Sequence, residues 1–482
     1  MSFLKKLFKN KVVLYLVSRY FTYFAQFLSS IIIAAKLGPY YFGIWGFLLL
    51  LINYFRISNF GIANATNILM VQHKNNEEQE KRIVAAAFTC LIGLSLLIGF
   101  FALYYGVIGI PFFEKYEVDN LFYVICLIAV FTHVNVFLMN VYRVKNSVFE
   151  VAFQQSAVPI LLLVVSLIFV KEELLYSLLA VYVIGNIAAL VLFLKNGKIL
   201  WGGQIKLIDI KKIIGKGFFL FLYNICFYLI IVSIKTIVSI FYSVEEFGLF
   251  SFSYSLANAI LLFLQALSFI VAPKIIDKLK STDSQKIISF INAIRTSYVS
   301  MAYGLAFLSL IIFPFFLKIV PQYEPALLVL QLAVLTVVLY TNSFGYNTYL
   351  KAQNKEKTIA VIAAFSLSLN VILALLMVKV WGVGYQYVIL ATLITYMLYT
   401  YLCVHYGKKQ LKTKDGILQN FVDFFQPSLL VPYVVAIIIV LIGNPFLMAI
   451  PFIIYLVLNL KSIKAIVDKI KTIINKPNVI DL

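Results

Sequence analysis

Charged residues are scarce in this chain: Asp, Glu, Lys and Arg make up 12% of its 482 residues. Soluble globular domains contain about 25%. Hydrophobic residues reach 62%, including 43 Phe and 31 Tyr, and this excess also lies outside the usage of soluble proteins. Such a composition requires many apolar spans of about 20 residues. It therefore excludes a soluble protein and predicts an all-α polytopic membrane protein.

Acidic residues are few as well, and they avoid the interiors of the predicted spans. Of the 20 Asp and Glu, Glu150 and Asp423 come closest, at the first and third positions of two spans. Four basic residues do lie inside predicted spans: Arg19, Arg56, Lys235 and Arg295. Charges at membrane depth are costly and usually mark a substrate or ion path. Cations without counter-carboxylates indicate that the spans enclose an anion.

Other chemical signals are weak. The four cysteines lie in apolar stretches and are too far apart for a metal signature, so neither a metal nor a cofactor is expected. A net charge of +20 would suit nucleic acid, but the basic runs are short and lie between spans. Lysines retained on the cytoplasmic side explain that charge more simply, and we expect no nucleic-acid partner. His133 is interpreted as a structural histidine, with a proton relay as the alternative.

Fourteen apolar segments are predicted to cross the membrane. They are residues 12–34, 42–66, 83–109, 120–142, 150–170, 175–194, 215–241, 247–273, 287–314, 326–350, 358–378, 384–406, 421–442 and 446–460. If both termini are cytoplasmic, inside segments hold 31 of the 40 Lys and Arg and outside loops hold five. This bias predicts a multi-pass membrane protein with both termini in the cytoplasm.

The charge bias makes a direct topological prediction. Reporter fusions placed after Lys212 and after Leu482 are both expected to report the cytoplasm, because each follows a lysine-rich segment. Paired phosphatase and fluorescent-protein fusions measure this. An external location for either site would refute the two-lobe topology.

The longest inside loop divides the chain into repeats. Residues 1–194 are predicted to form an N-terminal lobe of six spans and 215–406 a second lobe of six, with a basic cytoplasmic linker at 195–214. Residues 407–482 hold the last two spans and the tail. The first outer turn of each lobe is similar, Leu37 to Gly43 and Tyr242 to Gly248. Spans 1 and 7 run in the same direction, which predicts parallel repeats related by a pseudo-two-fold axis along the membrane normal.

Polar side chains recur on one face of several spans, at helical steps of three and four. The rows are Arg19, Tyr23, Gln26 and Ser30; Asn53, Arg56, Asn59 and Asn67; Asn224, Tyr228, Lys235 and Ser239; and Tyr254, Asn258, Gln265 and Ser268. A lipid-facing surface does not tolerate such rows, so they predict a polar substrate cavity between the lobes. Snorkelling to the headgroups is the alternative for the cations and is favoured for Arg295. For the asparagines the alternative is hydrogen bonding between helices.

The outer turn also carries a family resemblance. Lys36 to Trp45, followed by Ile57 to Ile62, resembles the first two helices of Wzx-type polysaccharide flippases, and the basic loop Tyr142 to Asn146 is similar too. These flippases belong to the multidrug, oligosaccharidyl-lipid and polysaccharide exporter superfamily. One departure is Asn59, because many relatives carry an acidic residue at this position. Any ion-coupling role of the relatives' carboxylate is therefore in doubt for this chain.

The resemblance implies a transporter without enzymatic activity. It would move undecaprenyl-pyrophosphate-linked oligosaccharide from the inner to the outer leaflet of the bacterial plasma membrane by alternating access, for cell-surface polysaccharide such as O-antigen. Membrane lipids and the polysaccharide polymerase machinery would be its partners, and Arg19, Arg56 and Lys235 would engage the pyrophosphate. A peptidoglycan-precursor flippase and a multidrug cation antiporter of the same fold remain alternatives. A membrane glycosyltransferase or polymerase fits less well, because the outer loops are short, and a membrane scaffold would leave the polar rows without a purpose.

Overall fold

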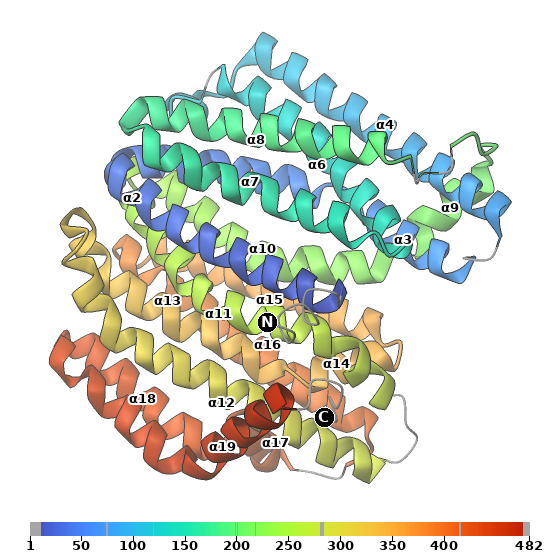
Figure 1. Cartoon of the computed structure of the whole chain (residues 1–482). Coiled ribbons are helices and arrows are strands. Elements are labelled where there is room, and N and C mark those ends of the chain that lie inside the picture. The colour runs from blue at the N-terminus through green and yellow to red at the C-terminus, as the bar shows by residue number, and fades with distance from the viewer. Residues whose placement is uncertain are drawn as a thin grey trace. The chain divides into compact units, whose positions relative to one another are not determined.

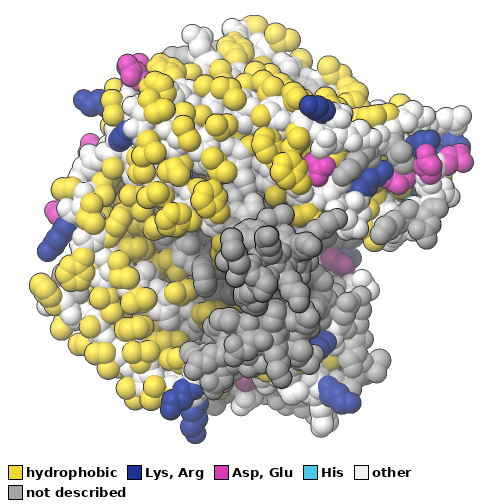
Figure 2. All heavy atoms as spheres, in the orientation of Figure 1, with side chains coloured by type: hydrophobic (Ala, Val, Ile, Leu, Met, Phe, Trp, Pro, Cys, Tyr) yellow, Lys and Arg dark blue, Asp and Glu magenta, His cyan; other side chains and the backbone are white. Residues whose placement is uncertain are grey.

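The computed structural model describes residues 11–73, 76–118, 120–197, 199, 201–216, 218–279, 284–413 and 416–475. In these residues all regular structure is helical. Eleven helical stretches there are long and apolar enough to cross a membrane, and the first, Ser18–Gln72, is long enough for two passes. Exposed apolar side chains cover much of the face in Figure 2, as expected of a surface that meets lipid. The predicted all-α polytopic fold is confirmed.

The chain forms two compact units. The first unit comprises residues 1–225 and 239–252, and the second comprises 226–238 and 253–482. Two helices, α10 (Phe218–Phe241) and α11 (Val244–Lys278), contribute to both. The predicted linker at 195–214 includes most of α9 (Leu207–Lys216), which packs on α3 and α4 in the first unit. Asp209 of α9 is held there by Arg82 of α4, with 2.6 Å between the charged atoms.

The first unit is a bundle in which α7 packs along α2 and α8, and α6 packs along α8 (Figure 1). Its helices are α2 (Lys11–Ile57), α3 (Ile62–Gln72), α4 (Glu77–Ile108), α5 (Pro111–Glu114), α6 (Leu121–Val144), α7 (Val148–Ile168), α8 (Lys171–Lys195) and α9. Local sequence sets several of their ends. Gly38 (φ 71°) breaks α2, and Pro39 restarts it with its fixed φ. Asn76 caps α4 by accepting the backbone N–H of Gln79.

The second unit pairs α15 with α16 and α18 with α19. Its helices are α12 (Ser284–Leu317), η1 (Pro321–Ala326), α13 (Leu327–Leu339), η2 (Tyr340–Ser343), α14 (Tyr346–Ala352), α15 (Glu356–Lys379), η3 (Tyr385–Tyr387), α16 (Ile389–Gln410), α17 (Ile417–Phe424), α18 (Pro427–Ile442), η4 (Pro445–Met448) and α19 (Ala449–Asn475). The core helix is α13, where every residue from Val329 to Leu339 is buried.

Each predicted span corresponds to helix, but three predicted boundaries are wrong. The segment 42–66 is interrupted by a turn at residues 58–61, between α2 and α3. The segment 326–350 is interrupted after Leu339 by η2 and Gly345. The segment 421–442 begins too early, because α17 is a separate short helix and Pro427 starts α18.

The two repeat turns meet in the first unit. A Cβ on Gly43 would lie 2.1 Å from the Val244 carbonyl oxygen, and one on Gly248 would lie 1.9 Å from the Pro39 carbonyl oxygen. In the repeat alignment Gly43 corresponds to Gly248, and Pro39 to Val244. The contact is therefore reciprocal, as it is in an isologous interface around a two-fold axis. Glycine is required at both positions because the backbones touch.

A basic side chain reinforces this crossing. Lys115, which follows α5, donates from Nζ to the carbonyl oxygens of Ser239 (2.7 Å) and Tyr242 (2.5 Å) at the end of α10. The adjacent Tyr116 hydroxyl also donates to Ser239 O, at 2.8 Å. A cation at a helix C-terminus is favoured by the helix dipole. Burial lowers the pKa of Lys115, and the nearby carboxylate of Glu246 opposes that shift.

Candidate anion-binding site

The first predicted cation is held by an aromatic hydroxyl. On α2, Arg19 Nη2 donates to Tyr23 Oη at 2.6 Å, and the guanidinium carbon lies 4.6 Å from the centre of the Tyr23 ring. The step of four residues puts both on one face, as predicted. Both side chains are half-buried, whereas Gln26 on the next turn is exposed. Among the described residues, none of the ion pairs involves Arg19.

The second cation, Arg56, stands at a helix break. It is an exposed residue in the last turn of α2, and α3 begins six residues later. Phe60 (φ 49°) and Gly61 (φ 73°) adopt left-handed backbone conformations in between. Asn59 fixes the turn, because its Oδ1 accepts the Gly61 N–H at 2.9 Å and its Nδ2 donates to Arg56 O at 3.2 Å. Interrupted membrane helices of this kind often border binding sites, since the start of a helix attracts anions.

His133 supports the same break from α6. Its Nε2 lies 2.7 Å from the carbonyl oxygen of Phe55, which can only accept, so Nε2 carries a proton. The ring is buried, with 2% of its surface exposed. The same carbonyl oxygen accepts the Ser58 backbone N–H at 3.0 Å and the Ser58 hydroxyl at 2.7 Å. The contact ties α6 to the end of α2, which supports the structural interpretation of His133.

The third cation pairs with tyrosine as well, in the second unit. Lys235 Nζ of α10 lies 4.8 Å from the centre of the Tyr254 ring of α11, and both side chains are half-buried. A cation over an aromatic face is attracted by the ring quadrupole but keeps its net charge. Two of the three cations predicted to bind substrate thus rest on tyrosines. Arg19 and Tyr23 belong to the first unit, whereas Lys235 and Tyr254 belong to the second.

The predicted amide ligands have varied surroundings. Asn53 and Asn258 are half-buried, Asn224 is exposed, and Asn59 is engaged in the turn described above. Gln265 belongs to α11, but its side chain lies outside the described residues. Elsewhere asparagines do join helices: Asn135 Nδ2 donates to Asn186 Oδ1 at 2.9 Å, and Asn370 Nδ2 donates to Ile230 O at 2.7 Å. Asn67, which belongs to one of the predicted polar rows, also joins two helices, because its Nδ2 donates to Asn140 Oδ1 at 3.0 Å.

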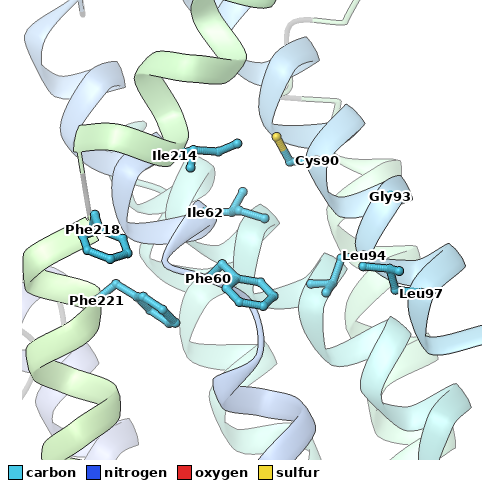
Figure 3. A pocket seen from close by; sticks show the side chains of 9 residues that line it. All are labelled: Phe60, Ile62, Cys90, Gly93, Leu94, Leu97, Ile214, Phe218 and Phe221. Carbon is cyan, nitrogen blue, oxygen red and sulfur yellow. The ribbon is translucent and has the colours of Figure 1, made fainter. Parts of the chain in front are cut away.

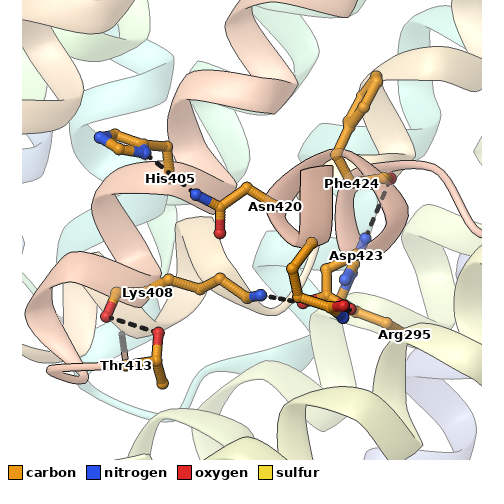
Figure 4. A network of polar contacts seen from close by, with 8 residues as sticks. Arg295, His405, Lys408, Thr413, Asn420, Asp423 and Phe424 are labelled. Atoms are coloured by element: carbon orange, nitrogen blue, oxygen red, sulfur yellow. Dashed lines mark hydrogen bonds and ion pairs between the residues drawn. The ribbon is translucent and has the colours of Figure 1, made fainter. Parts of the chain in front are cut away.

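The expectation that Arg295 snorkels to the headgroups is wrong. Its side chain is buried, with 3% exposed, and Nη2 donates to the carbonyl oxygens of Asn342 and Phe424, each at 3.2 Å (Figure 4). The guanidinium also lies 5.1 Å from the centre of the Tyr346 ring. Both carbonyls stand at helix ends, where they have no partner within their own helix. Arg295 therefore ties α12 to the break after α13 and to the end of α17.

A neighbouring ion pair fixes the same helix. Lys408 of α16 pairs with Asp423 of α17, and Asn420 of α17 lies 3.3 Å from His405 Nδ1 (Figure 4). Asp423 is thus neutralised at the edge of the second unit. Glu150, the other acid at a predicted span end, is buried in the first turn of α7 and accepts Asn196 Nδ2 at 3.0 Å. Both acids belong to local structural pairs.

Arg295→Met is expected to destabilise the protein strongly. The substitution keeps much of the apolar stem but leaves two buried carbonyl oxygens without a donor, at about 1 to 3 kcal/mol each. We expect a loss of about 2 to 6 kcal/mol, seen as a lower thermal unfolding temperature in detergent. Lys318→Met, at an exposed position just after the end of α12, is the control. Equal stability of the two variants would show that Arg295 is not structural.

Comparison with known proteins supports the fold. No family model matches the sequence, and no curated protein matches it. The structure does match solved membrane transporters of one fold class. A structure titled "Lipid II flippase MurJ, inward closed conformation" is similar with a TM-score of 0.69 at 16% identity, covering 97% of this chain and 100% of that one. An inward-facing multidrug resistance MATE family transporter of the MOP superfamily is similar with a TM-score of 0.65 at 10% identity, covering 83% and 100%. At these identities the likeness establishes the fold.

Proposed function

We propose that this protein translocates an anionic lipid-linked glycan, undecaprenyl-pyrophosphate-linked oligosaccharide, from the inner to the outer leaflet of the bacterial plasma membrane. The observation that carries the proposal is the chemistry of the polar rows: Arg19 and Lys235 rest on tyrosines, and Arg56 stands at a helix break. A pyrophosphate would give Arg19 and Lys235, whose contacts here are with tyrosines, a negative partner. Arginine suits it because its planar fork donates to two oxygens at once.

A peptidoglycan-precursor flippase is the second candidate. The MurJ structure is similar over its whole length, and a lipid-linked pyrophosphate would place the same demand on the cations. A multidrug cation antiporter fits less well, since exchange of cations ordinarily needs an intramembrane carboxylate, and the described Glu150 and Asp423 are already engaged locally. Complementation separates the candidates: rescue of surface polysaccharide in a strain lacking its flippase supports the first, and rescue of peptidoglycan synthesis supports the second.

Transport is expected to respond to membrane potential. Moving a pyrophosphate diester outward carries roughly two negative charges, and an inside-negative potential favours this by about 2.3 kcal/mol per charge per 100 mV, or about 4 to 5 kcal/mol. In vesicles containing the purified protein and lipid-linked oligosaccharide, we expect slower flipping when the potential is clamped to zero. Enzymatic trimming of the exposed glycan measures the rate. An unchanged rate would mean that potential does not drive this step, whereas no flipping at all would count against the proposed function.

A further inference from the structure

An apolar groove of about 340 Å³ lies beside the helix break in the first unit (Figure 3). Its walls come from the turn between α2 and α3, from one face of α4 and from the start of α10, and they include Phe60, Leu94, Leu97 and Phe221. Cys90 also lines the groove, and none of the lining residues is charged. The volume is at the lower end for ligand sites, which span about 300 to 1,000 Å³.

The groove is open and is bordered by exposed apolar side chains. Phe60 is 59% exposed, Leu97 is 55% exposed and Phe218 is 49% exposed. Phe60 faces Phe221 across the groove, with 5.8 Å between ring centres (Figure 3). The left-handed φ of 49° at Phe60 is unusual for an aromatic residue and is a strained conformation. A strained conformation persists only where the surrounding structure holds it in place. Such conformations cluster at active sites and ligand sites.

The chain connects this groove to the predicted headgroup site. Arg56 precedes Phe60 by four residues, and Asn224 follows Phe221 by three. On both walls, therefore, a polar residue of the predicted site lies within four residues of an aromatic residue of the groove. Gly61 keeps the walls close, since a Cβ there would lie 2.9 Å from Phe221 Cβ. An amphiphile with an anionic head and a hydrocarbon tail matches this order of charge, amide and apolar surface.

We propose that the groove binds the isoprenoid tail of the transported lipid, in the units next to the pyrophosphate, while Arg56 holds the head. This inference rests on the proposed function and deepens it by assigning a site for the tail. The charge at Arg56 favours an anionic lipid, and the apolar lining suits a hydrocarbon chain. The head and first tail units would then be held by one continuous element, the turn from Arg56 to Gly61.

Two glycines of α4 provide a matched test. Gly93 lines the groove, and a Cβ there would meet nothing within 4 Å, so a phenylalanine can fill the groove without touching the backbone. Gly99 on the same helix is equally open but does not line the groove. The probe is undecaprenyl pyrophosphate with a diazirine in its first isoprene units, added to the full-length protein in nanodiscs. Adducts are mapped by mass spectrometry.

We expect adducts on residues 90–97 of α4 and 218–221 of α10. Gly93→Phe should lower their yield at least fivefold, and Gly99→Phe should leave it unchanged. Leu97→Lys, at a half-exposed position, should lower the yield too and serves as the second variant if Gly93→Phe folds poorly. Inorganic pyrophosphate should compete weakly, because it lacks the tail.

Three outcomes would overturn the groove as a tail site. These are adducts elsewhere, equal yields from Gly93→Phe and Gly99→Phe, or equal labelling by a diazirine phosphatidylglycerol with the same sensitivity to Gly93→Phe, which would mark a site for bulk lipid. Export of surface glycan by the same variants separates this inference from the proposed function. Wild-type export with an unlabelled groove refutes the groove alone, whereas no export by the wild-type protein refutes the proposed function.

Discussion

Arg56→Ala is expected to abolish glycan export or reduce it severely while the protein still folds. Arg56 is an exposed residue at a helix break, so its removal relieves the cost of an intramembrane charge without opening a cavity in the core. Loss of a two-pronged contact with pyrophosphate removes two charge-assisted hydrogen bonds of about 1.5 to 3 kcal/mol each, or about a hundredfold or more in affinity. Surface glycan in a flippase-deleted strain, normalised to the amount of each variant in the membrane, measures the effect.

Graded variants test the geometry behind this expectation. Arg56→Lys should retain part of the activity, because the charge remains but the fork is lost. Arg19→Ala and Lys235→Ala should be impaired to a lesser degree, since each cation is one of several. Lys318→Ala, an exposed cation at the end of α12, should export normally. Wild-type glycan from the triple alanine variant of Arg19, Arg56 and Lys235 would show that these cations are not the substrate site.

Gly248→Ala is expected to destabilise the first unit. The added Cβ would lie 1.9 Å from the Pro39 carbonyl oxygen, and backbone on both sides leaves no flexible side chain to move aside. Overpacking typically costs about 1 to 3 kcal/mol and more where it meets backbone. The thermal unfolding temperature in detergent and the yield of membrane-inserted protein should both fall. Gly43→Ala should behave alike, because its contact with Val244 is the reciprocal one.

Gly99→Ala is the matched control for this expectation. It lies in the middle of α4, where an added Cβ meets nothing within 4 Å. Alanine is favoured over glycine inside a helix by about 1 kcal/mol, so this variant should be as stable as the parent or more so. A Gly248→Ala protein with the stability of Gly99→Ala would contradict the close crossing of the repeat turns.

Local patterns explain which features could be predicted. The step of four residues between Arg19 and Tyr23 fixes a shared helical face, and the structure confirms their contact. The pairing of Lys235 with Tyr254 joins two helices, so the sequence offered both residues without indicating that they meet. Lys115 was one of five basic residues in the predicted outside loops, and that scarcity was the available signal. Its carbonyl partners, more than 120 residues away, depend on packing.

Arg295 shows why burial escapes a hydropathy argument. Its position about eight residues into a predicted span was compatible with reaching the headgroups. In the structure the break after Leu339 and the end of α17 present two unpaired carbonyl oxygens to it. Those carbonyl oxygens lack a partner in their own helices because Gly345 (φ 89°) and Pro427 interrupt the helices around them. The role of the arginine is therefore set by helix ends that belong to other parts of the chain.

The sequence by itself determined the class of fold, the number of apolar segments and the excess of cations over acids within them. These properties follow from composition and from local periodicity, because a helix in a membrane must satisfy its own backbone. Tertiary structure decided where helices break, which cations are structural and how the repeat turns meet. Backbone contact at Gly43 and Gly248, and carbonyls freed at helix ends, arise when distant segments pack, and no local pattern encodes that packing.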